Sequence, residues 1–281
     1  MISFLGTGLL GSNFVKALIK KGEQVQIWNR TAAKAKALES MGARAFDNPA
    51  LAVKGASRVH LTLSDDQSVD EVLKSASPGL TPGTFIIDHT TTSAAGAASR
   101  TKYWKEQGYI YVHAPVFMGP QNALESTGVM LISGDQQVIK GLEPVLRTMT
   151  GQLVNLGPES NRAAGIKLLG NLLLMTITGG LSDLLALAKS LGIPAADVEA
   201  FISMWNPGSM IPARLKRILT GEFHSPSWEL NMARKDARLM IEATQGRSPL
   251  TVIPSIAQKM DHWIEKGHGN DDWTIITKDN I

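Results

Sequence analysis

The chain of 281 residues contains no cysteine, and this absence excludes disulfide bonds, thiol catalysis and zinc–thiolate centres. It is consistent with a reducing compartment. No basic segment followed by an apolar stretch stands at the N-terminus, so we expect no signal peptide and a cytoplasmic location. The net charge is only +3 and the basic residues are dispersed, which does not favour a nucleic-acid partner.

Long apolar runs are also lacking. The most apolar segment lies between Lys167 and Asp183 and has fifteen uncharged residues, fewer than the roughly 20 that span a bilayer. We therefore expect a buried helix between domains and no membrane partner. The six histidines show no metal-ligand spacing, so no metal site is expected. With 43% hydrophobic and 19% charged residues, the composition is that of an ordinary globular protein.

The first half of the chain alternates between strand-like and helix-like segments. Alternation at this spacing predicts an α/β fold with a parallel sheet covered by helices on both faces. Strands are expected at 1–5, 24–28, 58–62, 84–87 and 109–113, and further strands at 129–133 and 152–155. Helices are expected at 13–19, 32–40, 67–75, 93–107 and 136–149, with another beginning at 48–49.

A glycine-rich turn directly follows the first expected strand and opens the first expected helix. This is the context of a dinucleotide-binding fingerprint. Gly6 permits the tight turn, Gly8 lets the backbone approach a pyrophosphate, and Gly11 lets the helix pack on the strand. Amides at the helix N-terminus then face the phosphates. We predict a Rossmann-type domain whose cofactor loop is Gly6, Thr7, Gly8, Leu9, Leu10 and Gly11.

The end of the second expected strand indicates which cofactor is preferred. In NAD-binding units an acidic residue there accepts hydrogen bonds from the ribose 2′-OH. Here the position holds Asn29, followed by Arg30 and Thr31, so no carboxylate repels a 2′-phosphate and Arg30 offers donors to it. We expect these three residues to bind NADP in preference to NAD. The alternative is that Arg30 is a solvated residue of a surface turn.

The pattern becomes helical from Glu159 onward. A long apolar helix is expected to end near Leu191, Pro194 begins another, and loops are expected at 206–208 and 221–227. We therefore predict a Rossmann-type NADP-binding domain at 1–158 and an all-helical domain at 159–281 for substrate binding and oligomerisation. Ligands of such sheets lie at the carboxyl ends of the strands, so the catalytic cleft is expected between the domains.

Lys167 and Asn171 stand four residues apart and share one face of the long helix. A lysine that precedes an otherwise apolar helix is costly to bury unless it has a partner or a task. In a dry cleft its pKa would fall and it could donate or accept a proton near neutrality. The alternative is that Lys167 extends into solvent from the first helical turn.

The chain resembles the β-hydroxyacid dehydrogenase family over nearly its whole length. The resemblance rests on four segments in the family's order. They are the glycine fingerprint, Asp88-His89-Thr90-Thr91-Thr92, Gly165-Ile166-Lys167 with Asn171, and Lys235-Asp236.

The resemblance implies an NADP-dependent oxidoreductase that interconverts a small, 3-hydroxyacid-like hydroxy compound and its aldehyde or ketone. It assigns Lys167 as the general acid and base, and Asn171 as a substrate-binding residue. It also implies that Thr91 contacts the cofactor, that Lys235 lies against the nicotinamide, and that Leu63-Ser64 lines the cofactor path. By the same resemblance a homodimer or homotetramer forms through the helical domain. A solvated helix face remains the alternative for Lys235.

One segment departs from the family. Phe117-Met118-Gly119 stands where the family has Ser-Gly-Gly, which binds a substrate carboxylate. We expect these three residues to line a less polar substrate pocket, in which the amides of Met118 and Gly119 still meet an oxyanion. Alternatively, Phe117 is turned into the core. Two other functions stay open: an imine reductase, against which Lys167 argues, and a protein that binds NADPH without turnover.

Overall fold

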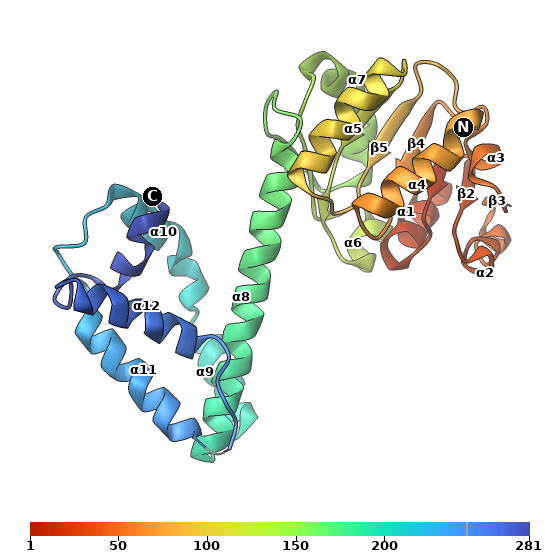
Figure 1. Ribbon diagram of the computed structural model, residues 1–281. Coiled ribbons are helices and arrows are strands. Elements are labelled where there is room, and N and C mark those ends of the chain that lie inside the picture. The colour runs from red at the N-terminus through yellow and green to blue at the C-terminus, as the bar shows by residue number, and fades with distance from the viewer. Residues whose placement is uncertain (246) are drawn as a thin grey trace. The chain divides into compact units, whose positions relative to one another are not determined.

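The computed structural model describes residues 1–245 and 247–281 (Figure 1). The chain divides into two compact units, Met1–Asn171 and Leu172–Ile281, and each is described by itself. The expected boundary after residue 158 precedes this division, which falls inside helix α8 (Arg162–Leu191). The first turns of α8 belong with the first unit because Ala163 and Ala164 are buried there and the Ala163 amide donates to Ser133 Oγ.

The first unit is built on a six-stranded sheet whose neighbouring strands are all parallel. Its strand order is β3-β2-β1-β4-β5-β6, the order of the dinucleotide-binding fold. The order reverses between β1 and β4, and ligands of such sheets bind where it does. The strands are β1 (Ile2–Leu5), β2 (Val25–Trp28), β3 (Arg44–Phe46), β4 (Arg58–Leu61), β5 (Phe85–Asp88) and β6 (Ile110–His113).

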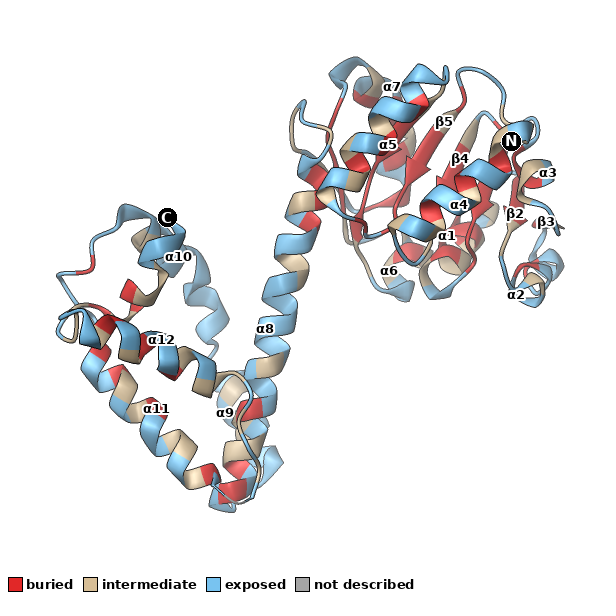
Figure 2. Cartoon of the chain, viewed as in Figure 1, coloured by how far each residue is buried: buried red, intermediate tan, exposed pale blue. Residues whose placement is uncertain are grey.

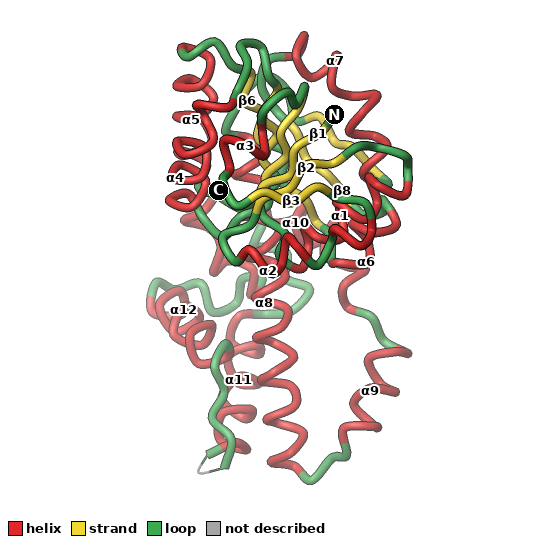
Figure 3. Tube along the Cα trace, turned by 90° about the vertical axis from the view of Figure 1, so that its right-hand side faces the viewer, coloured by secondary structure: helices red, strands yellow, loops and turns green. Residues whose placement is uncertain are grey.

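Helices cover both faces of this sheet, as the alternation predicts (Figure 3). One face packs against α1 (Leu9–Lys20), α6 (Pro120–Glu125) and α7 (Gln136–Leu146). The other packs against α3 (Pro49–Val53), α4 (Asp66–Ala76) and α5 (Ala94–Glu106). Because both faces are covered, all strands except the edge strand β3 are buried along most of their length, whereas the outer sides of α4, α5 and α7 are exposed (Figure 2). The remaining helix, α2 (Ala32–Lys36), follows β2.

A second, three-stranded sheet was not predicted. The expected strands at 129–133 and 152–155 form β8 (Val129–Ile132) and β9 (Gln152–Asn155), which pair in parallel. A third strand, β7 (Val116–Phe117), pairs antiparallel to β8 and places Phe117 opposite Val129. A strand of two residues has no periodicity to read, so its pairing could not be expected from the sequence.

The helix starts of the first unit differ in one respect that matters for binding. Side chains of Asn48, Asp65, Ser93 and Asp135 cap α3, α4, α5 and α7 by accepting backbone N–H groups. Helix α1 instead has Gly8 as its N-cap residue, which has no side chain to cap it. The first amides of α1 therefore stay available to an outside acceptor.

The second unit is helical, as expected. It comprises the rest of α8, α9 (Ala195–Met204), α10 (Ile211–Thr220), α11 (Leu230–Thr244) and α12 (Ile253–Glu265), with 3₁₀ turns at Pro207–Met210 and Trp273–Asn280. Its core contains Leu230, Met260, Trp263 and Ile275. Buried Asp183 of α8 accepts the amides of Thr251, Val252 and Ile253, and so caps the start of α12.

Helix α8 corrects the expectation of a buried apolar helix. Only 11% of its most apolar stretch is buried within the chain, and Leu169, Leu172 and Met175 are exposed. By length and composition alone, this helix could cross a membrane. An exposed apolar surface of this kind marks a contact with another protein surface or with a membrane.

Candidate active site

The glycine loop between β1 and α1 has the tight geometry that the sequence predicts. Gly6 has φ = +95°, a left-handed conformation that side chains disfavour. A Cβ atom on Gly6 would overlap the carbonyl oxygen of Thr62, and one on Gly11 would overlap the carbonyl oxygen of Gly6. The turn and the close approach of α1 to the sheet therefore both depend on glycine.

Gly8 occupies the open side of the same loop. A Cβ atom there would meet nothing within 4 Å, so the free space is a cradle in which a ligand can reach the backbone. The first amides of α1 lie beside it without a side-chain cap, and Leu9 is exposed. The hydroxyl of buried Thr7 has no hydrogen-bond partner among the described residues. Leu10 packs against the core. These features fit the pyrophosphate of a dinucleotide.

Asn29 holds this loop to the end of β2. Its Oδ1 accepts the amide of Thr7 at 2.9 Å, and its Nδ2 donates to the carbonyl of Thr31 at 3.0 Å. Both ends of the amide side chain are thus bound to the protein backbone. The structure thus shows Asn29 as a support that fixes the loop between Gly6 and Gly8, and its contact with the cofactor stays a prediction.

A cavity of about 560 Å³ opens beside the loop, a size typical of small-molecule sites. It brings together the predicted residues Gly6, Gly8, Asn29, Arg30, Thr31, Leu63 and Ser64. Lys34, four residues after Arg30, adds a second cation that was not predicted. Its spacing from Arg30 was the sequence feature that could have indicated it. Acidic Asp47 and Glu71 also line the cavity.

The loops after β4 and β5 are fixed to each other at the edge of the cavity. The amide of Leu63 donates to Thr90 Oγ1 at 2.9 Å, and the amide of Thr90 donates to buried Asp88 Oδ1 at 2.8 Å. Ser64 Oγ lies 2.7 Å from Ser68 Oγ. Thr91 follows on this loop and is exposed, and its contact with the cofactor stays a prediction.

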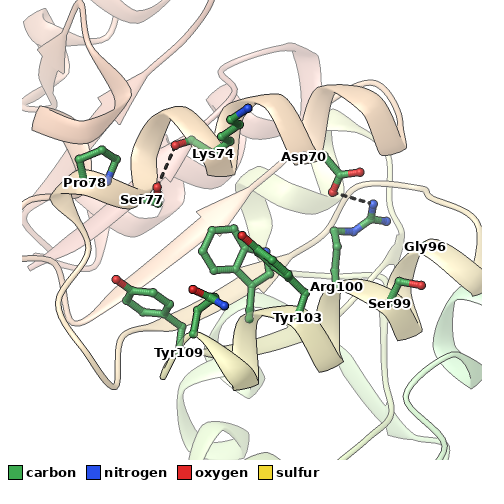
Figure 4. A pocket seen from close by; sticks show the side chains of 11 residues that line it. Asp70, Lys74, Ser77, Pro78, Gly96, Ser99, Arg100, Tyr103 and Tyr109 are labelled. Carbon is green, nitrogen blue, oxygen red and sulfur yellow. Dashed lines mark hydrogen bonds and ion pairs between the residues drawn. The ribbon is translucent and has the colours of Figure 1, made fainter.

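Asp88 is supported from the opposite side by a buried chain of hydrogen bonds. Tyr111 donates its hydroxyl proton to Asp88 Oδ2 at 2.6 Å, and Arg100 Nε donates to the Tyr111 oxygen at 3.1 Å. Arg100 also pairs with Asp66 and Asp70. The last pair borders a second cavity of about 680 Å³ between α4 and α5, in which Tyr103 and Tyr109 are also seen (Figure 4).

Lys167 projects from α8 into a buried position and is only 8% exposed. Its Nζ donates to Asn171 Oδ1 at 2.9 Å, which confirms that the two residues share one helix face. The same Nζ lies 4.1 Å from the centre of the Phe117 ring. Burial lowers the pKa of Lys167 from its ordinary value. Solvation of this ammonium, the alternative left open by the sequence, is therefore excluded.

The atypical segment at Phe117 splits into three different environments. Phe117 is half-buried and lies against Gly170 and Lys167. Met118 packs against the core. The Gly119 amide donates to Asn122 Oδ1 at 2.9 Å, so the suggested binding of an oxyanion by this amide is not supported. Of the three residues, Phe117 is the one that meets the Lys167–Asn171 pair.

Lys235 belongs to the second unit. It lies on α11, where its ammonium pairs with Asp236 at 2.8 Å and both side chains are partly exposed. This is the environment of a solvated helix face. Its contact with the nicotinamide stays a prediction.

Comparison with known proteins agrees with this geometry. Residues 1–157 match the NAD binding domain of 6-phosphogluconate dehydrogenase. The chain is 24% identical to 2-(hydroxymethyl)glutarate dehydrogenase of Eubacterium barkeri, over 99% of this chain and 93% of that protein. It is 25% identical to chloroplastic glyoxylate/succinic semialdehyde reductase 2 of Arabidopsis thaliana, over 96% of this chain and 76% of that protein.

A solved structure shares the whole fold. The imine reductase of Myxococcus stipitatus, in complex with NADP⁺, superposes with a TM-score of 0.90 and 22% identity, over 99% of each chain. The matched domain covers more than half of the chain and contains the glycine loop, the cavity and the strand order described above. The chain therefore belongs to the β-hydroxyacid dehydrogenase family, whose members are oxidoreductases that use a nicotinamide dinucleotide.

Proposed function

We propose that this oxidoreductase uses NADP to interconvert a small hydroxy compound and its aldehyde or ketone, with Lys167 as the general acid and base. The buried Lys167–Asn171 pair carries the proposal. A buried ammonium is costly unless it has a partner or a task, and Lys167 forms no ion pair with any described residue. A task in proton transfer accounts for its placement.

Reduced nicotinamide, when bound, supplies the hydride that the carbonyl carbon receives. Lys167 donates a proton from Nζ to the carbonyl oxygen as negative charge develops there, which yields the neutral hydroxyl group. In the reverse direction the neutral amine takes the hydroxyl proton. Burial lowers the pKa of Lys167, so this amine exchanges a proton near neutral pH more readily than a solvated lysine does.

Asn171 has two roles in this scheme. Its Oδ1 accepts one N–H of Lys167 and fixes the direction of the others. Its Nδ2 makes no hydrogen bond to a described residue and is available to donate to the substrate oxygen. Together the amine and the amide provide two donors for one carbonyl oxygen, which stabilises the charge that develops there.

The preference for NADP is supported by Arg30 and Lys34. Both line the cavity beside the glycine loop, at the end of β2, where the adenosine ribose of a dinucleotide lies in this fold. Two cations there favour a 2′-phosphate. Asn29, with both amide ends bound to the backbone, adds no carboxylate to oppose it.

Reduction of an imine is the second candidate. Phe117 favours it, because the aromatic ring removes the polar group with which the family binds a carboxylate and leaves an apolar wall beside Lys167. The ammonium of Lys167 disfavours it, because a protonated imine beside a second cation would be repelled. A parallel assay of cyclic imines and short aldehydes with NADPH separates the two functions.

Replacement of Lys167 by Ala tests the mechanism. We expect turnover of the best carbonyl substrate to fall by about 10²- to 10⁴-fold, the usual contribution of a general acid, with NADPH affinity unchanged. Lys140, exposed on α7, gives the matched control K140A, which should keep full turnover. Undiminished turnover in K167A refutes the role of Lys167. Tight NADPH binding with no turnover of any carbonyl or imine would favour the remaining hypothesis, that the protein binds NADPH without catalysis.

We also propose that the chain acts as a homodimer or homotetramer. The exposed apolar side chains of α8, together with Phe201, Met204 and Trp205, form more apolar surface than isolated surface residues would. A second copy of the same chain, which presents the same surface, can bury it. Light scattering coupled to gel filtration measures the mass directly. A monomer that requires detergent would instead favour a membrane contact for α8.

A further inference from the structure

The position of Phe117 relative to Lys167 carries a further inference, which rests on the proposed role of Lys167. Phe117 ends β7 and lies opposite Val129 of β8, so the strand pairing fixes its backbone. Its ring centre is 4.1 Å from Lys167 Nζ, within the range in which an aromatic face attracts a cation. Because Lys167 is nearly buried, this attraction is screened less than it would be in water.

Gly170 makes this arrangement possible. It stands one turn after Lys167 on α8, and a Cβ atom there would overlap Cζ of the Phe117 ring and lie 2.6 Å from Cε1. The ring therefore rests on the backbone of the helix that carries the lysine. Glycine inside a helix is unfavourable by roughly 0.5–1 kcal/mol relative to alanine, so its use at this position has a specific steric reason.

The surroundings of Lys167 leave the ring as its main electrostatic support. Asn171, on the same helix, contributes a neutral oxygen. Burial is the sole cause of the lowered pKa of Lys167, and no charged group on α8, β7 or any other described element contributes to it. The segment from Val116 to Gly119 carries no ionisable side chain.

We propose that Phe117, resting on Gly170, is a positioning residue that holds the Lys167 ammonium in its charged, proton-donating form. Its ring face and the Asn171 oxygen fix two sides of the ammonium and leave the remaining N–H groups for the substrate. The residue that stands where the family has a serine thus acts on the lysine rather than on a substrate carboxylate.

Direct titration of Lys167 tests this without any need for turnover. The rate at which Lys167 is acetylated is measured against pH by mass spectrometry, in the full chain with NADP⁺ bound. In F117L, we expect the pKa of Lys167 to fall by about one unit, equal to about 1.4 kcal/mol. F117Y keeps an aromatic face and should restore the wild-type value. F85L, which removes another half-buried ring, should change nothing.

The steric part is tested by a double-mutant cycle. G170A should displace the ring and lower the pKa of Lys167 as F117L does. In the F117A background the same change has no ring to meet, so adding G170A should leave the pKa unaltered. An unchanged pKa in F117L, or equal effects of G170A in both backgrounds, overturns the proposal. Undiminished turnover in K167A would refute the catalytic role instead, and the titration would still report on the ring.

Discussion

At the scale of single residues, Arg30 and Lys34 are the two cations that distinguish the cofactor cavity. Arg30 was predicted because it follows the second strand directly. Lys34 was not, because its approach to the cavity depends on where α2 begins. Arg30 forms no ion pair within 4 Å among the described residues, so its guanidinium is available to a phosphate.

We expect R30A to lower kcat/KM for NADPH by about 10- to 100-fold, the value of a lost charge-assisted hydrogen bond. The value for NADH should stay constant, because NADH has no 2′-phosphate. K36A is the matched control: Lys36, at the end of α2, pairs with Asp47 and does not itself line the cavity. Steady-state kinetics with both cofactors measure the ratio. An equal loss with NADPH and NADH would show that Arg30 supports the loop rather than binding the phosphate.

Lys167 and its neighbours mark the limit of what the sequence predicts at this scale. The pairing with Asn171 follows from helix geometry, because residues four apart share a face. The contact with Phe117 could not be foreseen, since it joins distant parts of the chain through the pairing of β7 with β8. The same holds for the hydrogen bond from Thr7 to Asn29.

At the scale of elements, most strands and helices of the dinucleotide-binding unit were predicted within a few residues, whereas the short β3 and α6 were not. Their signals are local, because apolar runs mark the strands and caps and glycines mark the helix ends. The pairing of β7, β8 and β9 was missed because a short strand and a separate sheet depend on tertiary contacts. The exposure of α8 was missed for a related reason, since an apolar sequence does not reveal which molecule covers it.

The connection of α8 to α12 makes a prediction at this scale. Burial by itself would raise the pKa of Asp183, but hydrogen bonds from three amides outweigh it and lower the pKa below its ordinary value. D183A should therefore destabilise the helical unit by about 2 kcal/mol, because it removes a charged cap. Hydrogen exchange at Thr251, Val252 and Ile253 should accelerate.

D183N is the control for this cap, because it keeps one acceptor oxygen without the charge and should lose less than D183A. Denaturant unfolding followed by circular dichroism gives the change in the free energy of unfolding. If D183A and wild type unfold at the same denaturant concentration, the hydrogen bonds to Asp183 do not hold α12 in place.

At the scale of the whole molecule, three buried histidines make stability depend on pH. His89 donates from Nδ1 to the carbonyl of Ala114 at 2.7 Å, so its Nε2 accepts from His60 Nδ1 at 3.0 Å. Burial, above all, lowers the pKa values of His60 and His113 and brings that of His89 to about 4. All three are neutral in the folded protein at pH 7.

Unfolded histidines titrate near pH 6.5. As the pH falls below that value, the histidines of the unfolded chain bind protons, whereas those of the folded chain stay neutral, and stability therefore decreases. For His89 this continues to about pH 4 and amounts to roughly 3 kcal/mol. We expect the urea midpoint to drop clearly between pH 7.5 and pH 5. H262Q should show the same drop, because His262 is exposed. A flat profile would mean that these histidines take up protons in the native state as readily as in the unfolded chain.

The double hydrogen bonding of Asn29 has a consequence for redesign of this enzyme. If the enzyme prefers NADPH, as proposed, an engineer who wishes to convert it to NADH would place aspartate at this position, to engage the ribose. The new carboxylate could still accept from Thr7, but it could no longer donate to Thr31 as the present amide does. A change of this side chain that favours NADH would therefore also weaken the hydrogen bonds that hold the loop. A successful conversion needs a compensating donor near Thr31, introduced in the same step.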